Sequence, residues 1–88
     1  MMDINYNLLP THIHPGVQDY IEHGHLPGSF LQAVICNDLF QSFGRADEIN
    51  HERMFHIVSF FYNEAPGQCW GSPKKMQVWA EHNGLDGA

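Results

Sequence analysis

The chain has 88 residues, of which 43% are hydrophobic, and its ten acidic residues outnumber its four basic ones to give a net charge of −6. This length supports one hydrophobic core, so we expect a single domain over residues 1–88. The acidic balance opposes attraction to a phosphate backbone and argues against direct nucleic-acid binding. No apolar run reaches the roughly 18 residues of a membrane span, and the N-terminus carries no basic leader, so a cytoplasmic protein is expected.

The first half of the chain predicts two helices. Residues 11–23 place apolar side chains at i, i+4, i+7 and i+8, and Gly24 ends this helix in the left-handed conformation: the apolar positions are Ile13, Val17, Tyr20 and Ile21. A second helix is predicted from about Ser29 to Phe43, after Pro27-Gly28 and before a stop at Gly44. Its apolar stripe is Phe30, Leu31, Val34, Ile35 and Leu39.

The second half predicts two more helices. Asp47 is a suitable N-cap for the third, which residues 63–67 end, and its stripe is Met54, Ile57, Val58, Phe61 and Tyr62. Ser72 and Pro73 fit the N-cap and first position of a fourth helix, which Asn83-Gly84 closes. The expected fold is therefore all-α, a compact bundle of about four short helices, with residues 1–8 and 85–88 loosely ordered.

Seven histidines are the most unusual feature of the composition. Imidazole is a common ligand for transition metals, and the pairs His12/His14 and His23/His25 raise the hypothesis of a metal site. Two residues apart on a helix, however, side chains point away from each other. We therefore expect surface histidines and no metal or other cofactor, and we expect the two cysteines to be free thiols because a reducing compartment disfavours disulfides.

Basic and aromatic residues suggest an anion-binding or partner-binding site, whose six candidates are Lys74, Lys75, Ser72, Arg45, Trp70 and Tyr62. Lys74 and Lys75 fall in the first turn of the fourth helix beside Ser72, where the backbone favours a phosphate or carboxylate, although two solvated lysines are the simpler explanation. Trp70 and Tyr62 could stack on a ligand or partner, although a core role is the simpler interpretation of Trp70.

Polar residues gather where the second predicted helix meets the third. Asp38 lies at the edge of a buried stripe, so it either points to water at the rim or finds a partner such as Arg45 or a backbone N–H. A structural ion pair that fixes this turn is the preferred interpretation, with a catalytic carboxylate as the alternative. The chain has no glycine-rich phosphate loop and no compelling nucleophile and base in sequence order. The sequence therefore predicts a protein that is not an enzyme.

Four motifs resemble a family of small proteins encoded by tailed phages and prophages. They are PGSFLxAVxxNDL at residues 27–39, GRADxxN at 44–50, YNExP at 62–66 and WGSP at 70–73. The similarity spans residues 9–80 and assigns no functional residue. It implies an accessory factor that binds and blocks or redirects a host protein, including components of antiviral defence.

The preferred hypothesis is a binding protein that uses an acidic helical surface to occupy a basic site on a host protein. The acidic contact candidates, beside Asp3, are Asp19, Glu22, Glu48 and Glu52. The alternative is a small-ligand binder that holds a nucleotide or phosphorylated signal between protomers, and a histidine metal site is the second alternative. A two-fold dimer is expected, because short helices leave apolar faces partly uncovered.

Overall fold

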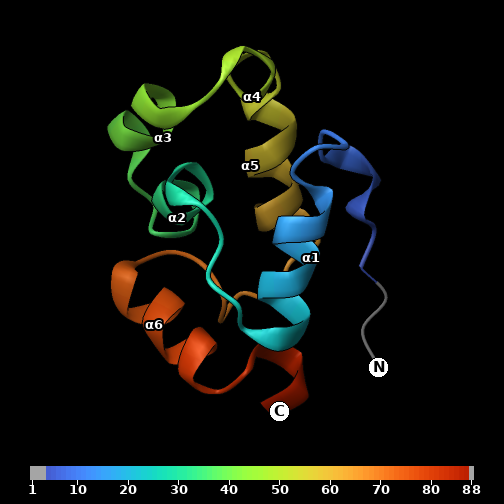
Figure 1. Cartoon of the computed structure of the whole chain (residues 1–88), viewed down its shortest axis with the longest axis vertical. Coiled ribbons are helices and arrows are strands. Elements are labelled where there is room, and N and C mark those ends of the chain that lie inside the picture. The colour runs from blue at the N-terminus through green and yellow to red at the C-terminus, as the bar shows by residue number, and fades with distance from the viewer. Residues whose placement is uncertain (1–3, 88) are drawn as a thin grey trace.

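A computed structural model describes residues 4–87, which form six α-helices and two short 3₁₀ helices and contain no strand. In chain order they are η1 (Tyr6–Leu8), α1 (His14–His23), α2 (Ser29–Ile35), α3 (Leu39–Arg45), α4 (Glu48–Glu52), α5 (Met54–Asn63), α6 (Pro73–Glu81) and η2 (Gly84–Gly87). The all-helical class is confirmed, whereas the expected number of four helices is too low. Figure 1 shows α3, α4 and α5 at one end of the molecule and α6 with η2 at the other.

The helix predicted from Ser29 to Phe43 is two helices. Asn37 adopts a left-handed φ of 62°, and the Asp38 N–H donates to the Ala33 carbonyl at 2.9 Å, a bond that terminates α2. The Asp38 carboxylate then accepts from the Gln41 N–H at 3.1 Å and caps α3. Gly44 lies inside α3 and does not end it. Asp38 is thus exposed and has a backbone N–H partner, whereas the ion pair with Arg45 that the sequence favours is not formed, because Arg45 donates to the Ser29 carbonyl.

The third predicted helix is divided at Arg53, whose φ and ψ of −101° and 13° separate α4 from α5. Its start is confirmed, because Asp47 accepts from the Asn50 N–H at 2.7 Å. Ser72 caps α6 in the same way, and Gly24 closes α1 in the left-handed conformation, both as predicted. Local capping chemistry therefore decides where these helices begin and end.

The core lies between α1, α2, α5 and α6, and Tyr20 connects several of its parts. Its fully buried hydroxyl donates to the Cys69 carbonyl at 2.6 Å, while its own carbonyl accepts from Trp79 Nε1 at 3.1 Å. One residue thereby joins α1 to the segment before α6 and to α6 itself. Burial raises the pKa of the Cys69 thiol to about 12, so this sulfur stays protonated at neutral pH.

Both ends of the described range pack against the core. Leu85 in η2 contacts the core, although the sequence predicts a loosely ordered segment there, and η2 lies against α1. At the N-terminal end the Tyr6 ring stacks on Phe60 with centroids 5.5 Å apart, and its hydroxyl donates to Glu22 at 3.1 Å. Residues 1–3 and 88, which belong to the segments expected to be loose, lie outside the described range.

Two glycines allow η2 to approach α1. Gly84 has φ +62°, and a Cβ added there would lie 2.6 Å from the Ile21 carbonyl oxygen and 2.7 Å from the Gly24 nitrogen. A Cβ on Gly24 would in turn lie 2.7 Å from the Gly84 nitrogen. The two backbones therefore cross at a separation that only glycine permits.

Candidate functional site: an uncovered apolar face

Large apolar side chains are exposed on three consecutive helices. We call them the apolar face: Leu39, Phe40, Phe43, Ile49, Phe55, Val58 and Tyr62. Phe40 is 87% exposed, Phe55 78% and Tyr62 74%. Single exposed apolar residues are ordinary, whereas a concentration of this kind marks an interaction site. Only two other large apolar residues of the described range, Leu26 and Val78, are exposed.

Helix α5 explains why part of this face is uncovered. Seven of its ten residues are apolar or aromatic, and they surround the helix on all sides. The buried set is Met54, Ile57, Phe60 and Phe61, and the exposed set is Phe55, Val58 and Tyr62. A helix that is apolar all round is normally buried all round. The i, i+3, i+7 spacing of the exposed set forms a stripe along α5 that nothing in residues 4–87 covers.

A groove of about 130 Å³ lies between α3 and α5 in the apolar face. Leu39 borders it from the α3 side, Val58 and Tyr62 from the α5 side, and Trp70 from the segment before α6. The Tyr62 and Trp70 rings lie with centroids 6.2 Å apart. Trp70 also packs on the core, and its buried indole N–H meets no acceptor among the described residues. The groove is therefore apolar, with aromatic groups on one wall.

Carboxylates border the apolar face. Glu48, His51 and Glu52 stand at i, i+3 and i+4 on α4 and so share one side of that helix. The His51 ring contacts the Phe43 ring edge-on at 5.1 Å, which puts this side of α4 next to the apolar face. Asp38 lines the groove itself. We call Asp38, Glu48 and Glu52 the acidic rim.

The predicted anion-binding residues lie at two places in the fold. Ser72, Lys74 and Lys75 are together at the start of α6, whereas Arg45 ends α3 and donates to the Ser29 carbonyl at 3.3 Å. The Ser72 hydroxyl accepts from the Lys75 N–H at 3.1 Å, Lys75 Nζ donates to the Gly67 carbonyl at 3.4 Å, and Lys74 is exposed. The two aromatic candidates, Tyr62 and Trp70, meet in the groove.

The four acidic candidates within the described range separate into two pairs. On α1, Asp19 binds the His25 ring at 3.0 Å, and Glu22 accepts from Tyr6 and Gln18. On α4, Glu48 and Glu52 are exposed and belong to the acidic rim. Asp3 lies outside the described residues. The α1 carboxylates therefore serve contacts within the chain, and the α4 carboxylates remain open to a partner.

Three of the histidines, His12, His23 and His25, pair with carboxylates, and the His23 and His25 rings lie with centroids 6.0 Å apart. His12 binds Asp47 at 3.0 Å, and His23 binds Asp86. The Asp86 hydrogen bond raises the pKa of His23, while the N–H of Asn50 lowers the pKa of Asp47. Within residues 4–87 no group of three or more potential ligands is placed to hold a metal ion. The cysteines are free, as predicted, with Cys36 half-buried and Cys69 buried.

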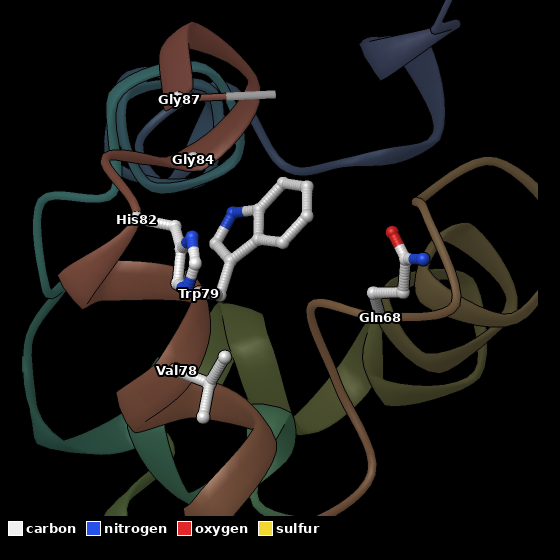
Figure 2. A pocket seen from close by; sticks show the side chains of 6 residues that line it. All are labelled: Gln68, Val78, Trp79, His82, Gly84 and Gly87. Carbon is white, nitrogen blue, oxygen red and sulfur yellow. The ribbon is translucent and has the colours of Figure 1, made fainter.

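A second hollow, of about 330 Å³, lies beside α6 and η2 (Figure 2). The Trp79 and His82 side chains come from the C-terminal end of α6, and the Gln68 side chain comes from a separate segment. The remaining lining residues are Val78, Gly84 and Gly87. None of the described residues that line this hollow is lysine or arginine, the side chains that commonly bind phosphate.

Comparison of the chain with protein-family models, with curated proteins and with solved structures gives no match. Among the described residues no helix is long and apolar enough to cross a membrane, and the longest, α1 and α5, have ten residues each. The geometry of the apolar face is therefore the main guide to function.

Proposed function

We propose that this chain is a non-enzymatic protein-binding module whose contact surface is the apolar face. The observation that carries the proposal is the exposure of seven large apolar side chains on α3, α4 and α5. Complete burial of a fully exposed side chain of this kind contributes about 1.5–3 kcal/mol, and a half-exposed one contributes proportionately less. Aromatic residues dominate the energetics of protein interfaces, and four of the seven are aromatic.

This proposal changes the role of the acidic residues. The sequence alone suggests that acidic side chains form the contact surface, whereas Asp19 and Glu22 bind side chains of this same chain. Glu48 and Glu52 fit the rim of an interface with an apolar centre, which is the usual arrangement of protein contacts. The acidic excess then guides the partner's approach, and the apolar face holds it.

The resemblance to small phage proteins extends the proposal to the identity of the partner. An accessory factor of that kind acts on a protein of the host cell, in the cytoplasm, and inhibits or redirects it. A component of antiviral defence is one such partner. This extension rests on the four sequence motifs, and the binding function rests on the apolar face.

Two leucines offer a matched test. Leu39 borders the groove and is 60% exposed, while Leu26 is 55% exposed and lies outside the apolar face. Leu39→Asp adds a carboxylate to the first turn of α3, where the helix dipole favours it, so folding should be preserved. Leu26→Asp adds the same charge elsewhere.

The experiment compares the proteins that immobilised wild type, Leu39→Asp and Leu26→Asp retain from host lysate, measured by quantitative mass spectrometry. We expect Leu26→Asp to retain the same proteins as wild type. Leu39→Asp should lose specific proteins at least tenfold, which corresponds to about 1.4 kcal/mol. Identical recovery by all three chains would rule out the apolar face as the binding surface.

A further inference from the structure

The size of the groove indicates what enters it. Its volume of about 130 Å³ is small for a metabolite or cofactor, because such pockets occupy about 300–1,000 Å³. A hollow of this size suits one apolar side chain that belongs to a larger partner. Exposed residues on the two helices that border the groove, such as Phe55 on α5 and Phe40 on α3, then contact the neighbouring part of that partner.

The shape of the apolar face favours a helical partner. Phe55, Val58 and Tyr62 run along α5 over seven residues, which corresponds to a rise of about 10 Å. A partner helix with apolar residues at i, i+3 or i+4, and i+7 presents anchors over the same distance. Recognition of an extended peptide by strand addition requires a sheet edge, and residues 4–87 contain no strand.

The charge around the apolar face favours a cationic partner. Residues 37–64 carry five carboxylates and two guanidinium groups, a net charge of −3. One of the two, Arg45, donates to the Ser29 carbonyl on α2. Asp38 lines the groove, and the exposed Glu48 and Glu52 lie on the side of α4 whose His51 contacts Phe43. Lysine or arginine residues that flank the anchors of a partner helix therefore meet complementary charge.

From these observations we infer that the apolar face binds a cationic amphipathic helix. The helix inserts one apolar anchor into the groove between α3 and α5 and lays further anchors along Phe55 and Tyr62. Its basic residues approach the acidic rim. This inference rests on the proposed function and specifies the class of segment that the module recognises.

The same charge disfavours a second copy of this chain as the occupant. A two-fold contact through the apolar face would place an acidic rim against its own copy, and like charges brought together cost free energy. The inference thus differs from the sequence-based expectation of a dimer. Light scattering on the purified wild type and on Leu39→Asp gives the oligomeric state of each, and so shows whether a second copy of the chain occupies the apolar face.

The binding test uses three synthetic peptides of about 18 residues, long enough to form a helix. The first carries leucine anchors at helical spacing on a lysine background, the second replaces lysine with glutamate, and the third has a central proline. Fluorescence anisotropy of each labelled peptide with the full chain gives the affinity. We expect the lysine peptide to bind and the other two to bind at least tenfold more weakly. Added salt should weaken binding of the lysine peptide, because it screens the charges of the acidic rim.

Variants of the chain separate groove binding from general attraction to an acidic protein. Leu39→Asp makes the chain more negative, so general attraction predicts equal or tighter binding of the lysine peptide, whereas the groove predicts at least tenfold weaker binding. Leu26→Asp carries the same added charge and should bind like wild type. The double variant Glu48→Lys/Glu52→Lys should bind the lysine peptide more weakly and the glutamate peptide more tightly than the wild type does.

Several results would overturn the inference. They are equal binding of the lysine and glutamate peptides, undiminished binding of the proline peptide, no binding of any peptide, and a wild-type dimer that Leu39→Asp converts to a monomer. In each of these cases Leu39-dependent capture of host proteins would still support the proposed function. If Leu39→Asp captures the same host proteins as wild type, the proposed function itself fails.

Discussion

The two sides of α5 contain the same kinds of residue and have opposite environments. On the inner side Phe60 is fully buried, and η1 covers it through the Tyr6 ring. On the outer side Phe55 is 78% exposed, and no element of residues 4–87 covers it. Hydrophobicity therefore does not decide which side enters the core. Neighbouring segments decide it, and the side they leave open is available to another molecule.

The largest effect is expected when one phenylalanine on each side of α5 is substituted in turn. Phe60→Ala should lower the free energy of unfolding by about 3–5 kcal/mol, because it leaves a cavity in the core. Phe55→Ala should change it by no more than about 0.5 kcal/mol. Urea denaturation followed by circular dichroism gives both values, and Phe60→Leu provides a milder variant if Phe60→Ala does not fold. A large cost for Phe55→Ala would mean that the outer side is covered in solution.

A smaller effect on stability is expected where η2 packs against α1. Gly84→Ala forces a side chain into a left-handed conformation, which costs about 1–3 kcal/mol, and pushes its Cβ toward the Ile21 carbonyl. Gly67→Ala is the control, because a Cβ there meets nothing within 4 Å. Thermal unfolding should show a lower Tm for Gly84→Ala and little change for Gly67→Ala. Equal Tm values for the two variants would show that the crossing with Gly24 does not constrain η2.

The smallest effect concerns the ion pair that links α1 to η2. The Asp86 hydrogen bond raises the pKa of His23 above its usual 6.5, so protonation favours the folded state. This contribution is complete below about pH 6.5 and is lost as the pH rises through the raised pKa. We therefore expect the difference in Tm between wild type and His23→Gln to be present at pH 6 and to disappear at pH 9. A difference that does not change with pH would contradict a charged pair.

Several helix ends could be predicted from the sequence, because they depend on local chemistry. Gly24, Asp47 and Ser72 act through the backbone of their own helices, and each lies where the sequence predicts. The break between α2 and α3 was missed because the apolar stripe from Phe30 to Leu39 continues across it. Its signal was nevertheless present, since asparagine tolerates the left-handed conformation at a helix end and the aspartate that follows it caps the next helix.

The apolar face could not be predicted in the same way. In a helix that is apolar all round, periodicity does not select one buried side. The predicted stripe of the third helix included Val58 and Tyr62, whereas the structure exposes both and buries Phe60. Local patterns also do not reveal that Glu22 binds Tyr6, because the two residues meet only after folding. The site therefore depends on tertiary packing rather than on a motif.

The positions of the two tryptophans have a spectroscopic consequence. Trp79 is buried beside α1 with its N–H bonded to Tyr20, whereas Trp70 stands in the wall of the groove. With Trp79→Phe, the remaining emission reports on the groove, and with Trp70→Phe it reports on the docking of α6. The chain thus carries two tryptophans in different environments, so that single-tryptophan variants can follow occupancy of the groove and docking of α6 without an attached dye.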